Sequence, residues 1–140
     1  VNLTATTIPE HAAADAPLIL VDVDRGHTVD AEAGAVRRIL GTLIRDAVAA
    51  AAGPLAASDA PTLREVVITS VHTDDSIEIE IADSSDASGD TIGMATASAE
   101  SMATRLGGSL RVYRCPEGGK AVTISLPRRR VAAGALRRAA

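Results

Sequence analysis

The sequence predicts an α+β domain, a two-layer α/β sandwich in which a mixed β-sheet is covered on one face by about three helices. Two observations indicate this fold class. Apolar residues recur with helical spacing in some segments and alternate with polar residues in others. The helical segments are separated mainly by pairs of strands, an order that places helices together on one face of a sheet. The length of 140 residues suits one domain of this kind.

Three segments have the characteristics of helices. The first begins at the capping box Thr7-Ile8-Pro9-Glu10 and should end before Pro17. The longest covers residues 31–52, where apolar residues recur every three or four positions until Gly53-Pro54 ends the pattern. The third is expected from about Met94 to Leu106, where two glycines follow.

Five further segments have the composition of β-strands, namely residues 18–24, 65–71, 76–82, 109–114 and 121–126. In residues 76–82, isoleucines alternate with glutamates, which indicates one buried side and one solvent-facing side. Asp83 continues the parity of the isoleucines, so a carboxylate stands at the end of a row that faces the core. Because Pro127 ends the last strand, we expect one domain over residues 1–127 and a basic C-terminal tail over residues 128–140.

Composition and charge exclude several classes of function. One Tyr and no Phe or Trp exclude an aromatic platform for single-stranded nucleic acid, and a single Cys excludes an intramolecular disulfide. No segment approaches the roughly 20 apolar residues of a membrane span. Residues 1–104 have a net charge of −12 and residues 105–140 a net charge of +8. We therefore expect no specific nucleic-acid recognition and no membrane contact, and only the tail would attract polyanions.

Four motifs follow one another along this arrangement. They lie in residues 36–48, 79–85, 91–97 and 106–112, the last followed by Gly118-Gly119 and Ser125-Leu126-Pro127. In order and spacing they resemble the N box, the two glycine boxes and the closing hairpin of the ATP-binding domain of sensor histidine kinases. That family belongs to the Bergerat-fold (GHKL) ATPases. The resemblance covers about residues 1–127 and implies the Bergerat fold.

The resemblance implies four candidate residues of a nucleotide site: Thr42, Asp46, Asp83 and Gly93. Asp83 matches the aspartate with which the family accepts a hydrogen bond from the adenine amino group. Asp46 stands where the family has its Mg²⁺-binding asparagine, and Thr42 stands at the earlier asparagine. Gly93 is kept from the second glycine box and precedes a helix whose N-terminus would face phosphate. The implied cofactors are ATP and Mg²⁺, with Asp46 as the metal ligand.

Three of these residues also have a simpler interpretation. Asp83 would cap a backbone turn at the end of its strand, although burying a charge without a partner is costly and favours a binding site. Asp46 would be a solvated residue on the flank of the helix beside Arg45, although Asp is chemically able to bind Mg²⁺. Gly93 would merely precede a helix.

Several family residues are replaced in this chain. Both N-box asparagines are missing, two glycines of the second glycine box are replaced, and Ser85 replaces a glycine of the first. Lys120 follows Gly119 where the family has Gly-Thr. Only nine residues separate Asp83 from Gly93, so the family's long ATP lid is expected to be absent. No histidine lies in a phosphoacceptor setting, and we assign no catalytic residue.

These observations leave two main hypotheses for function. The first is a degenerate ATP-binding domain of a two-component sensor histidine kinase, with weak or altered nucleotide binding. The second is a pseudo-ATPase interaction module, or a scaffold resembling a histidine phosphotransferase, that does not bind ATP. The expected partners are a response regulator or a helical phosphoacceptor domain, a homodimer of the full-length protein is a further candidate, and the expected location is cytoplasmic. Polyanion binding by the basic tail is a third hypothesis.

Overall fold

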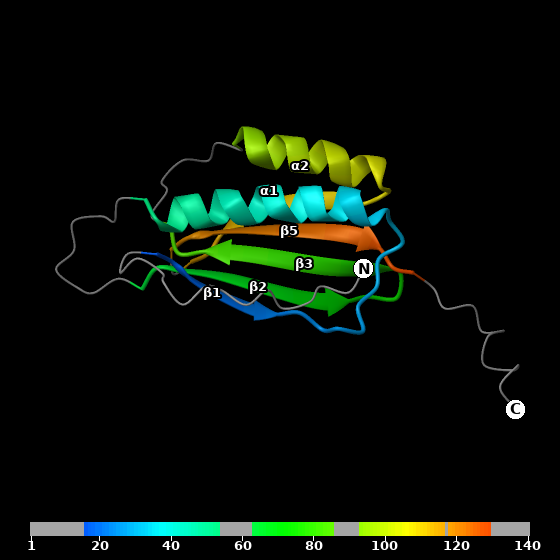
Figure 1. Ribbon diagram of the computed structural model, residues 1–140, viewed down its shortest axis with the longest axis horizontal. Coiled ribbons are helices and arrows are strands. Elements are labelled where there is room, and N and C mark those ends of the chain that lie inside the picture. Colours follow the sequence, from blue (N-terminus) through cyan, green and yellow to red (C-terminus); the bar gives the residue numbers. More distant parts are fainter. Residues whose placement is uncertain (1–15, 54–62, 86–92, 117, 130–140) are drawn as a thin grey trace, which may run out of the picture.

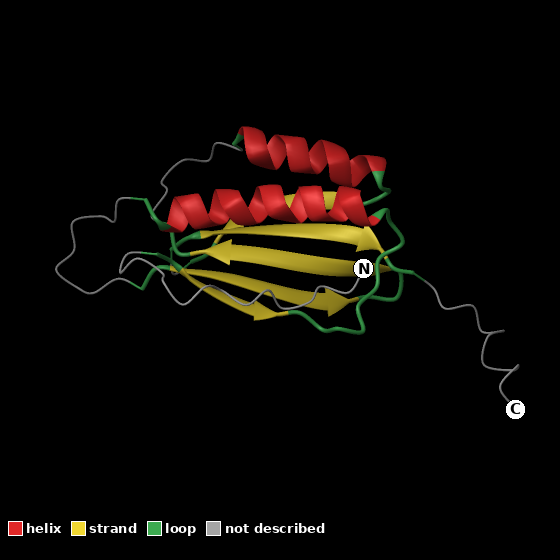
Figure 2. Cartoon of the chain, viewed as in Figure 1, coloured by secondary structure: helices red, strands yellow, loops and turns green. Residues whose placement is uncertain are grey.

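Two helices lie on one face of a five-stranded sheet in the computed structural model of the chain (Figures 1 and 2). The structure describes residues 16–53, 63–85, 93–116 and 118–129. The elements in chain order are β1 (Leu18–Asp22), α1 (Ala33–Ala51), β2 (Glu65–His72), β3 (Ser76–Asp83), α2 (Met94–Arg105), β4 (Ser109–Arg114) and β5 (Lys120–Pro127). The sheet order is β1-β2-β3-β5-β4, in which β1 is parallel to β2 and all other neighbours are antiparallel. The predicted α+β class with a mixed sheet is confirmed.

The ends of the described elements differ from the predicted ends by no more than two residues. The largest difference at a helix start is in α1, which begins at Ala33 because the Glu32 side chain caps it. This carboxylate accepts hydrogen bonds from the backbone N–H groups of Gly34 at 2.8 Å and Ala35 at 3.0 Å. The helix predicted after Thr7 lies outside the described residues. Within the described ranges, neither helix has the length and hydropathy needed to cross a membrane.

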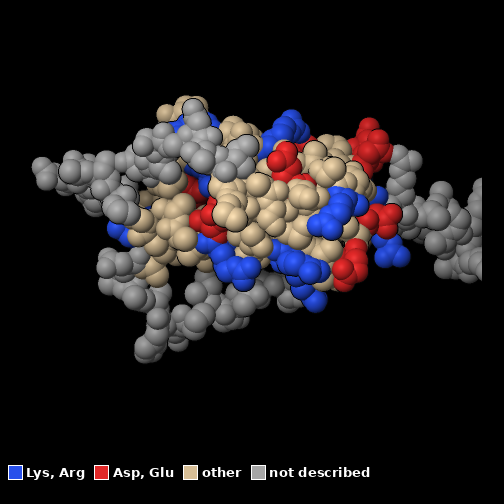
Figure 3. All heavy atoms as spheres, turned by 90° about the horizontal axis from the view of Figure 1, so that it is seen from above, with Lys and Arg blue, Asp and Glu red and all other residues tan. Residues whose placement is uncertain are grey.

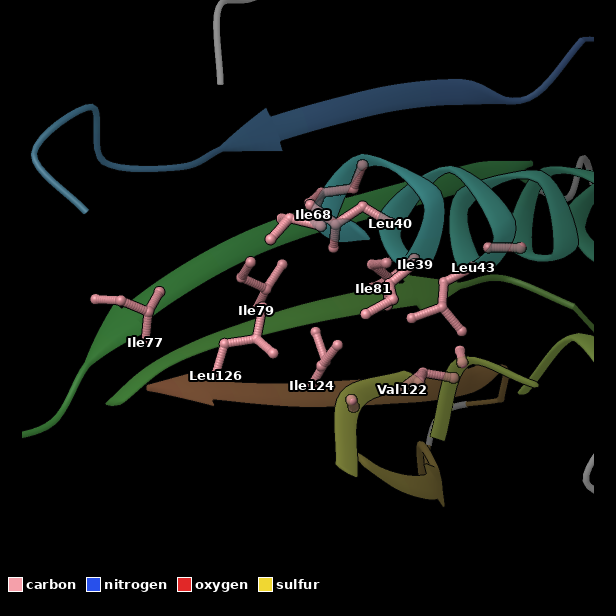
Figure 4. Close-up of a cluster of buried hydrophobic side chains, with 14 of the residues drawn as sticks. Ile39, Leu40, Leu43, Ile68, Ile77, Ile79, Ile81, Val122, Ile124 and Leu126 are labelled. Carbon is pink, nitrogen blue, oxygen red and sulfur yellow. The ribbon is translucent and has the colours of Figure 1, made fainter. Parts of the chain in front are cut away.

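The hydrophobic core lies between the helices and the sheet. Figure 4 shows Ile39 of α1 in this layer together with Ile81 of β3 and Ile124 of β5, and all three are at most 1% exposed. Burying one side chain of this size contributes about 1.5–3 kcal/mol to stability. On α2 the buried positions are Thr96, Ala99 and Ala103, and the two alanines allow this helix to approach its neighbours closely.

The alternation in β3 determines which side chains face the helices. The three isoleucines of this strand are buried in the core, whereas Glu78 and Glu80 are half-buried on the opposite, open face of the sheet. Asp83 has the parity of the isoleucines and is only 5% exposed. The predicted row that ends in a carboxylate is therefore present, and Asp83 points toward the helix layer.

After β5 the backbone still forms hydrogen bonds to the rest of the domain. The backbone N–H of Arg128 donates to the carbonyl of Asp75 at 2.8 Å, and that of Arg129 donates to the carbonyl of Thr28 at 3.0 Å. These two residues, which the sequence analysis placed at the start of the tail, are held against neighbouring loops. The rest of the proposed tail lies outside the described residues.

The open face of the sheet carries a polar cluster around the single tyrosine of the chain. The Tyr113 hydroxyl donates to the carboxylate of Glu80 and forms a hydrogen bond with Oγ1 of Thr123 at 2.8 Å. Beside it, Arg111 pairs with Glu78 at 3.4 Å, and these side chains line a depression of about 300 Å³. The hydrogen bond to Glu80 favours the protonated phenol and raises the pKa of Tyr113 above 10.0.

We predict that the substitution Glu80→Gln lowers the pKa of Tyr113 toward 10.0, because it removes the charged acceptor that favours the phenol. Since the folded-state pKa is raised, this hydrogen bond stabilises the fold at pH values below the unfolded pKa, and its contribution is lost as pH rises through the folded pKa. Ultraviolet titration of tyrosinate measures this residue alone, because the chain has one tyrosine. Glu78→Gln is the matched control, and identical titration curves for wild type and Glu80→Gln would contradict the prediction.

Candidate functional site

Three charged side chains from separate elements lie at one end of the sheet, on its helix-covered side. Asp83 ends β3, and Lys120 begins β5 as its partner in the antiparallel register. Register partners on adjacent strands project to the same face of a sheet. The Lys120 ammonium reaches α1, where Nζ pairs with Oδ2 of Asp46 at 3.1 Å. The pairing of β3 with β5 therefore brings a buried carboxylate and an ion pair together.

Asp83 is the most unusual group of this cluster. Its Oδ1 accepts a hydrogen bond from the backbone N–H of Ser85 at 3.0 Å, so the carboxylate closes the turn after β3. Oδ2 of Asp83 is buried and has no hydrogen-bond partner among the described residues. The register neighbour of Asp83 on β2 is the fully buried Val66. A buried carboxylate oxygen without a donor is costly to the folded state. The bond from Ser85 is the turn-closing contact of the simpler interpretation of Asp83, and it involves only Oδ1.

Ser85 presents a second buried oxygen without a partner. It is 6% exposed, and its Oγ has no hydrogen-bond partner in the described structure. A hydroxyl can donate and accept, whereas an ionised carboxylate can only accept. Oγ of Ser85 can therefore donate or accept a further hydrogen bond, whereas Oδ2 of an ionised Asp83 can only accept one. In the sequence, Ser85 stands out only as the replacement of a glycine, and the polar residues around it give no signal of its burial.

Gly119 holds the end of β3 close to the start of β5. Its φ of +91° lies in the region that favours glycine, and a Cβ built on it would lie 2.0 Å from the carbonyl oxygen of Asp83. Any side chain here would force the backbone of Asp83 away. The glycine therefore positions the carboxylate, a role that the sequence analysis did not assign to it.

The surroundings of Asp46 do not fit a Mg²⁺ site. Mg²⁺ requires octahedral oxygen ligands, and proteins hold it with carboxylates together with substrate phosphates. The single carboxylate of Asp46 is already paired with an ammonium group, with 34% of the Asp46 side chain and 28% of the Lys120 side chain exposed. In the described part of the chain, no group of three or more His, Cys, Asp or Glu side chains is arranged to hold a metal. Asp46 is thus the partner of Lys120 rather than a residue solvated beside Arg45.

The other two candidate residues are less closely associated with this cluster. Thr42 lies one turn before Asp46 on α1, and its hydroxyl donates to the carbonyl of Arg38 at 2.8 Å. Gly93 is the N-cap of α2, without a side-chain capping bond, and a Cβ added to it would meet nothing within 4 Å. The N-terminus of α2 and the C-terminus of α1 lie at the same end of the domain as the end of β3 (Figure 1). No close packing against described residues requires glycine at position 93.

The helix layer carries charges of both signs on its outer surface. Figure 3 looks onto this layer and shows acidic and basic side chains interspersed among uncharged ones. No broad field of one sign extends over the visible described surface. At the end of β3, the cation that the sheet register places opposite the buried carboxylate is Lys120.

Comparison with known proteins gives matches at the level of structure. No family model matches the sequence. No curated protein matches it. Full-length ShkA in complex with AMPPNP has a TM-score of 0.65 and 18% identity over 85% of this chain and 27% of its own. The nucleotide-free catalytic domain of the histidine kinase ThkA has a TM-score of 0.64 and 13% identity over 79% of both chains. The Acinetobacter baumannii histidine kinase AdeS has a TM-score of 0.64 and 14% identity over 83% of this chain and 56% of its own.

These similarities show the fold of the chain. It is the two-layer α/β fold of histidine kinase catalytic domains, as the order of motifs in the sequence predicted. The chain spans about a quarter of the length of ShkA and about half the length of the AdeS structure. The low identities, 12–18% among the similar structures, leave the individual site residues to be argued from their geometry.

We predict that Gly119→Ala destabilises the domain more than Gly118→Ala does. Both glycines have positive φ, +91° and +99°, so both substitutions cost about 1–2 kcal/mol in backbone strain. Only residue 119 approaches another backbone closely, whereas a Cβ at residue 118 meets nothing within 4 Å. The added overlap should cost about a further 1–3 kcal/mol. Urea unfolding of both variants measures the difference, and equal losses of stability would contradict the proposed role of Gly119.

Proposed function

We propose that this chain is a degenerate ATP-binding domain of a two-component signalling protein, and that it binds adenine nucleotides weakly through Asp83. The observation that carries the proposal is Oδ2 of Asp83, which is buried and has no hydrogen-bond partner within the described ranges of the chain. An exocyclic amine such as that of adenine would donate to this oxygen and remove the cost of burying it alone. The hydroxyl of Ser85, also buried and unpartnered, would complete the recognition of the base edge.

The fold supports this proposal. The chain has the fold of histidine kinase catalytic domains, and one of the similar structures, ShkA, is a complex with the ATP analogue AMPPNP. Asp83 is at the end of β3, where the sequence resemblance expects the adenine acceptor. The fold and the place of Asp83 at the end of β3 therefore support a role for this carboxylate in recognising a base.

Recognition of the phosphates is expected to be weaker than recognition of the base. The sequence keeps one glycine of the second glycine box, Gly93, and that glycine is not enclosed by described residues. Phosphoryl transfer depends on positioning and on neutralising charge, so missing phosphate contacts reduce it strongly. ADP should accordingly bind about as well as ATP. The phosphoacceptor, in this proposal, is a histidine on a separate helical domain, and a response regulator is the downstream partner.

An interaction module without nucleotide binding is the second candidate function. It is favoured by the ion pair between Asp46 and Lys120, which takes the place where the family's metal ligand is expected. In this case the domain would contribute only a surface to a signalling assembly. The two candidates differ in one measurable property, the binding of adenine nucleotides by the purified chain.

The test is calorimetric titration of the chain with ADP, ATP and GDP, compared with the variant Asp83→Asn. Asparagine keeps the shape of the side chain but replaces one oxygen by an NH₂ group. If the amide oxygen accepts from Ser85, the NH₂ group faces the adenine amine, and two donors then oppose each other. A hydrogen bond to a charged group is worth about 1.5–3 kcal/mol, so ADP affinity should fall by about 10-fold or more.

The controls separate base recognition from general anion binding. GDP should bind more weakly than ADP, because guanine presents a carbonyl where adenine presents its amine. Glu78→Gln, on the open face, should leave ADP binding unchanged. Undetectable binding of both ADP and ATP to the wild type would favour the interaction module, and submicromolar ATP affinity would contradict the degenerate site.

A further inference from the structure

We propose that the ammonium group of Lys120 takes the role of the divalent cation in this site, so that adenine nucleotides bind without Mg²⁺. The inference rests on the proposed nucleotide binding and adds to it the chemistry of the phosphate end. It starts from the disagreement between the family resemblance, which implies a Mg²⁺ ligand at residue 46, and the structure, which pairs Asp46 with Lys120.

The ion pair is built across the two layers of the domain. Lys120 Nζ lies 3.1 Å from Asp46 Oδ2, and these residues are 74 positions apart in the sequence. The helix contributes the anion and the first residue of β5 contributes the cation. Both side chains remain about one-third exposed, so a ligand can approach them from solvent. The Asp46–Lys120 pair is therefore accessible to a ligand in solution.

The ammonium keeps capacity for an anionic ligand. A lysine has three N–H donors, and the bond to Asp46 uses one of them. A compact ammonium binds phosphate oxygens as a point charge. Asp46 fixes the position of the ammonium group and lowers the free-energy cost of its partly buried charge in the nucleotide-free protein. An unpaired Asp46 carboxylate would repel a polyphosphate. The Asp46–Lys120 pair is neutral overall, and its ammonium group can bind a phosphate oxygen.

The positions of Asp83 and Lys120 in the sheet suit the base and the phosphates of one nucleotide. They are register partners on adjacent strands and project to the same side of the sheet. Gly119, directly before Lys120, packs against the carbonyl of Asp83 and fixes this relation. A base held by Asp83 would consequently have a fixed cation at the same end of the domain. A divalent ion would have to displace the ammonium from Asp46 or bind beside it.

The test is calorimetric titration of the full chain with ADP and with adenosine, each in EDTA and in Mg²⁺. We expect ADP to bind with the same or higher affinity in EDTA, because Mg²⁺ neutralises the phosphates that Lys120 would contact. Lys120→Met should reduce ADP affinity by about 10-fold and leave adenosine affinity within about two-fold. Asp46→Asn should increase ADP affinity in EDTA, because it removes the negative charge and keeps an oxygen acceptor for the ammonium.

A matched ion pair on the opposite face provides the control. Arg111 and Glu78 pair at 3.4 Å on the open face of the sheet, so Arg111→Met removes one positive charge from the chain at a distance from the site. This variant should bind ADP like the wild type at moderate salt. An equal loss in Arg111→Met and Lys120→Met would show that only the net charge matters, and it would overturn the inference.

The outcomes distinguish this inference from the proposed function. If ADP binds only with Mg²⁺ while Asp83→Asn still lowers ADP affinity as proposed above, the role of Lys120 is wrong and the base site stands. If neither adenosine nor ADP binds, both in EDTA and in Mg²⁺, both proposals are wrong. If Lys120→Met lowers the melting temperature, its loss of ADP affinity no longer tests the role of the lysine. The test is then the increase in ADP affinity expected for Asp46→Asn, because that variant keeps the lysine. Unchanged or reduced ADP affinity in a folded Asp46→Asn chain would contradict the inference.

Discussion

The antiparallel pairing of β3 with β5 is the constraint on which the site depends. It sets Asp83 opposite Lys120, and it brings Gly119 so close to the carbonyl of Asp83 that no side chain can be present there. A shift of one residue in this register would turn the isoleucines of β3 to solvent together with Asp83. The buried isoleucines that stabilise the core therefore also fix the orientation of the carboxylate. Stability of the sheet and geometry of the site are coupled in this fold.

The site contains two electrostatic arrangements that differ in their exposure. Asp83 is buried, and one of its oxygens closes a turn while the other has no partner in the part of the chain that the structure describes. Asp46 and Lys120 are partly exposed and satisfy each other. Surface ion pairs of this kind contribute only about 0–1 kcal/mol to stability, so the pair is not needed to hold the fold together. The packing of the fold does not explain the burial of Oδ2 of Asp83. A ligand that donates a hydrogen bond to this oxygen would therefore gain the most binding free energy.

The fold could be predicted because its signals are local. Alternating isoleucines and glutamates define β3, the helical spacing over residues 31–52 defines α1, and glycines follow α2. The same alternation predicted that Asp83 would face the core. The cap formed by Glu32 was not expected, because a glutamate before a helix is also common on exposed surfaces. The order of motifs predicted the kinase-type fold, which the structural similarities confirm.

The contacts of the site could be predicted only in part, because they join residues distant in the sequence. Nothing near Asp46 indicates that its partner is Lys120, 74 residues away, because that contact depends on the register of β5 and on the position of α1. The burial of Ser85 likewise depends on how the turn after β3 folds back, and its polar neighbours indicate an exposed loop. Sequence reasoning identified the carboxylates, and the tertiary structure supplied the cation.

The central claim is that the buried oxygen of Asp83 recognises an adenine base beside a cation supplied by the protein. A crystal structure of the chain grown with ADP and EDTA measures this directly. The account predicts the adenine amine within about 3 Å of Oδ2 of Asp83, and Nζ of Lys120 in contact with a phosphate oxygen. A nucleotide bound elsewhere on the domain, or a structure in which another group of the chain donates to that oxygen, would contradict it.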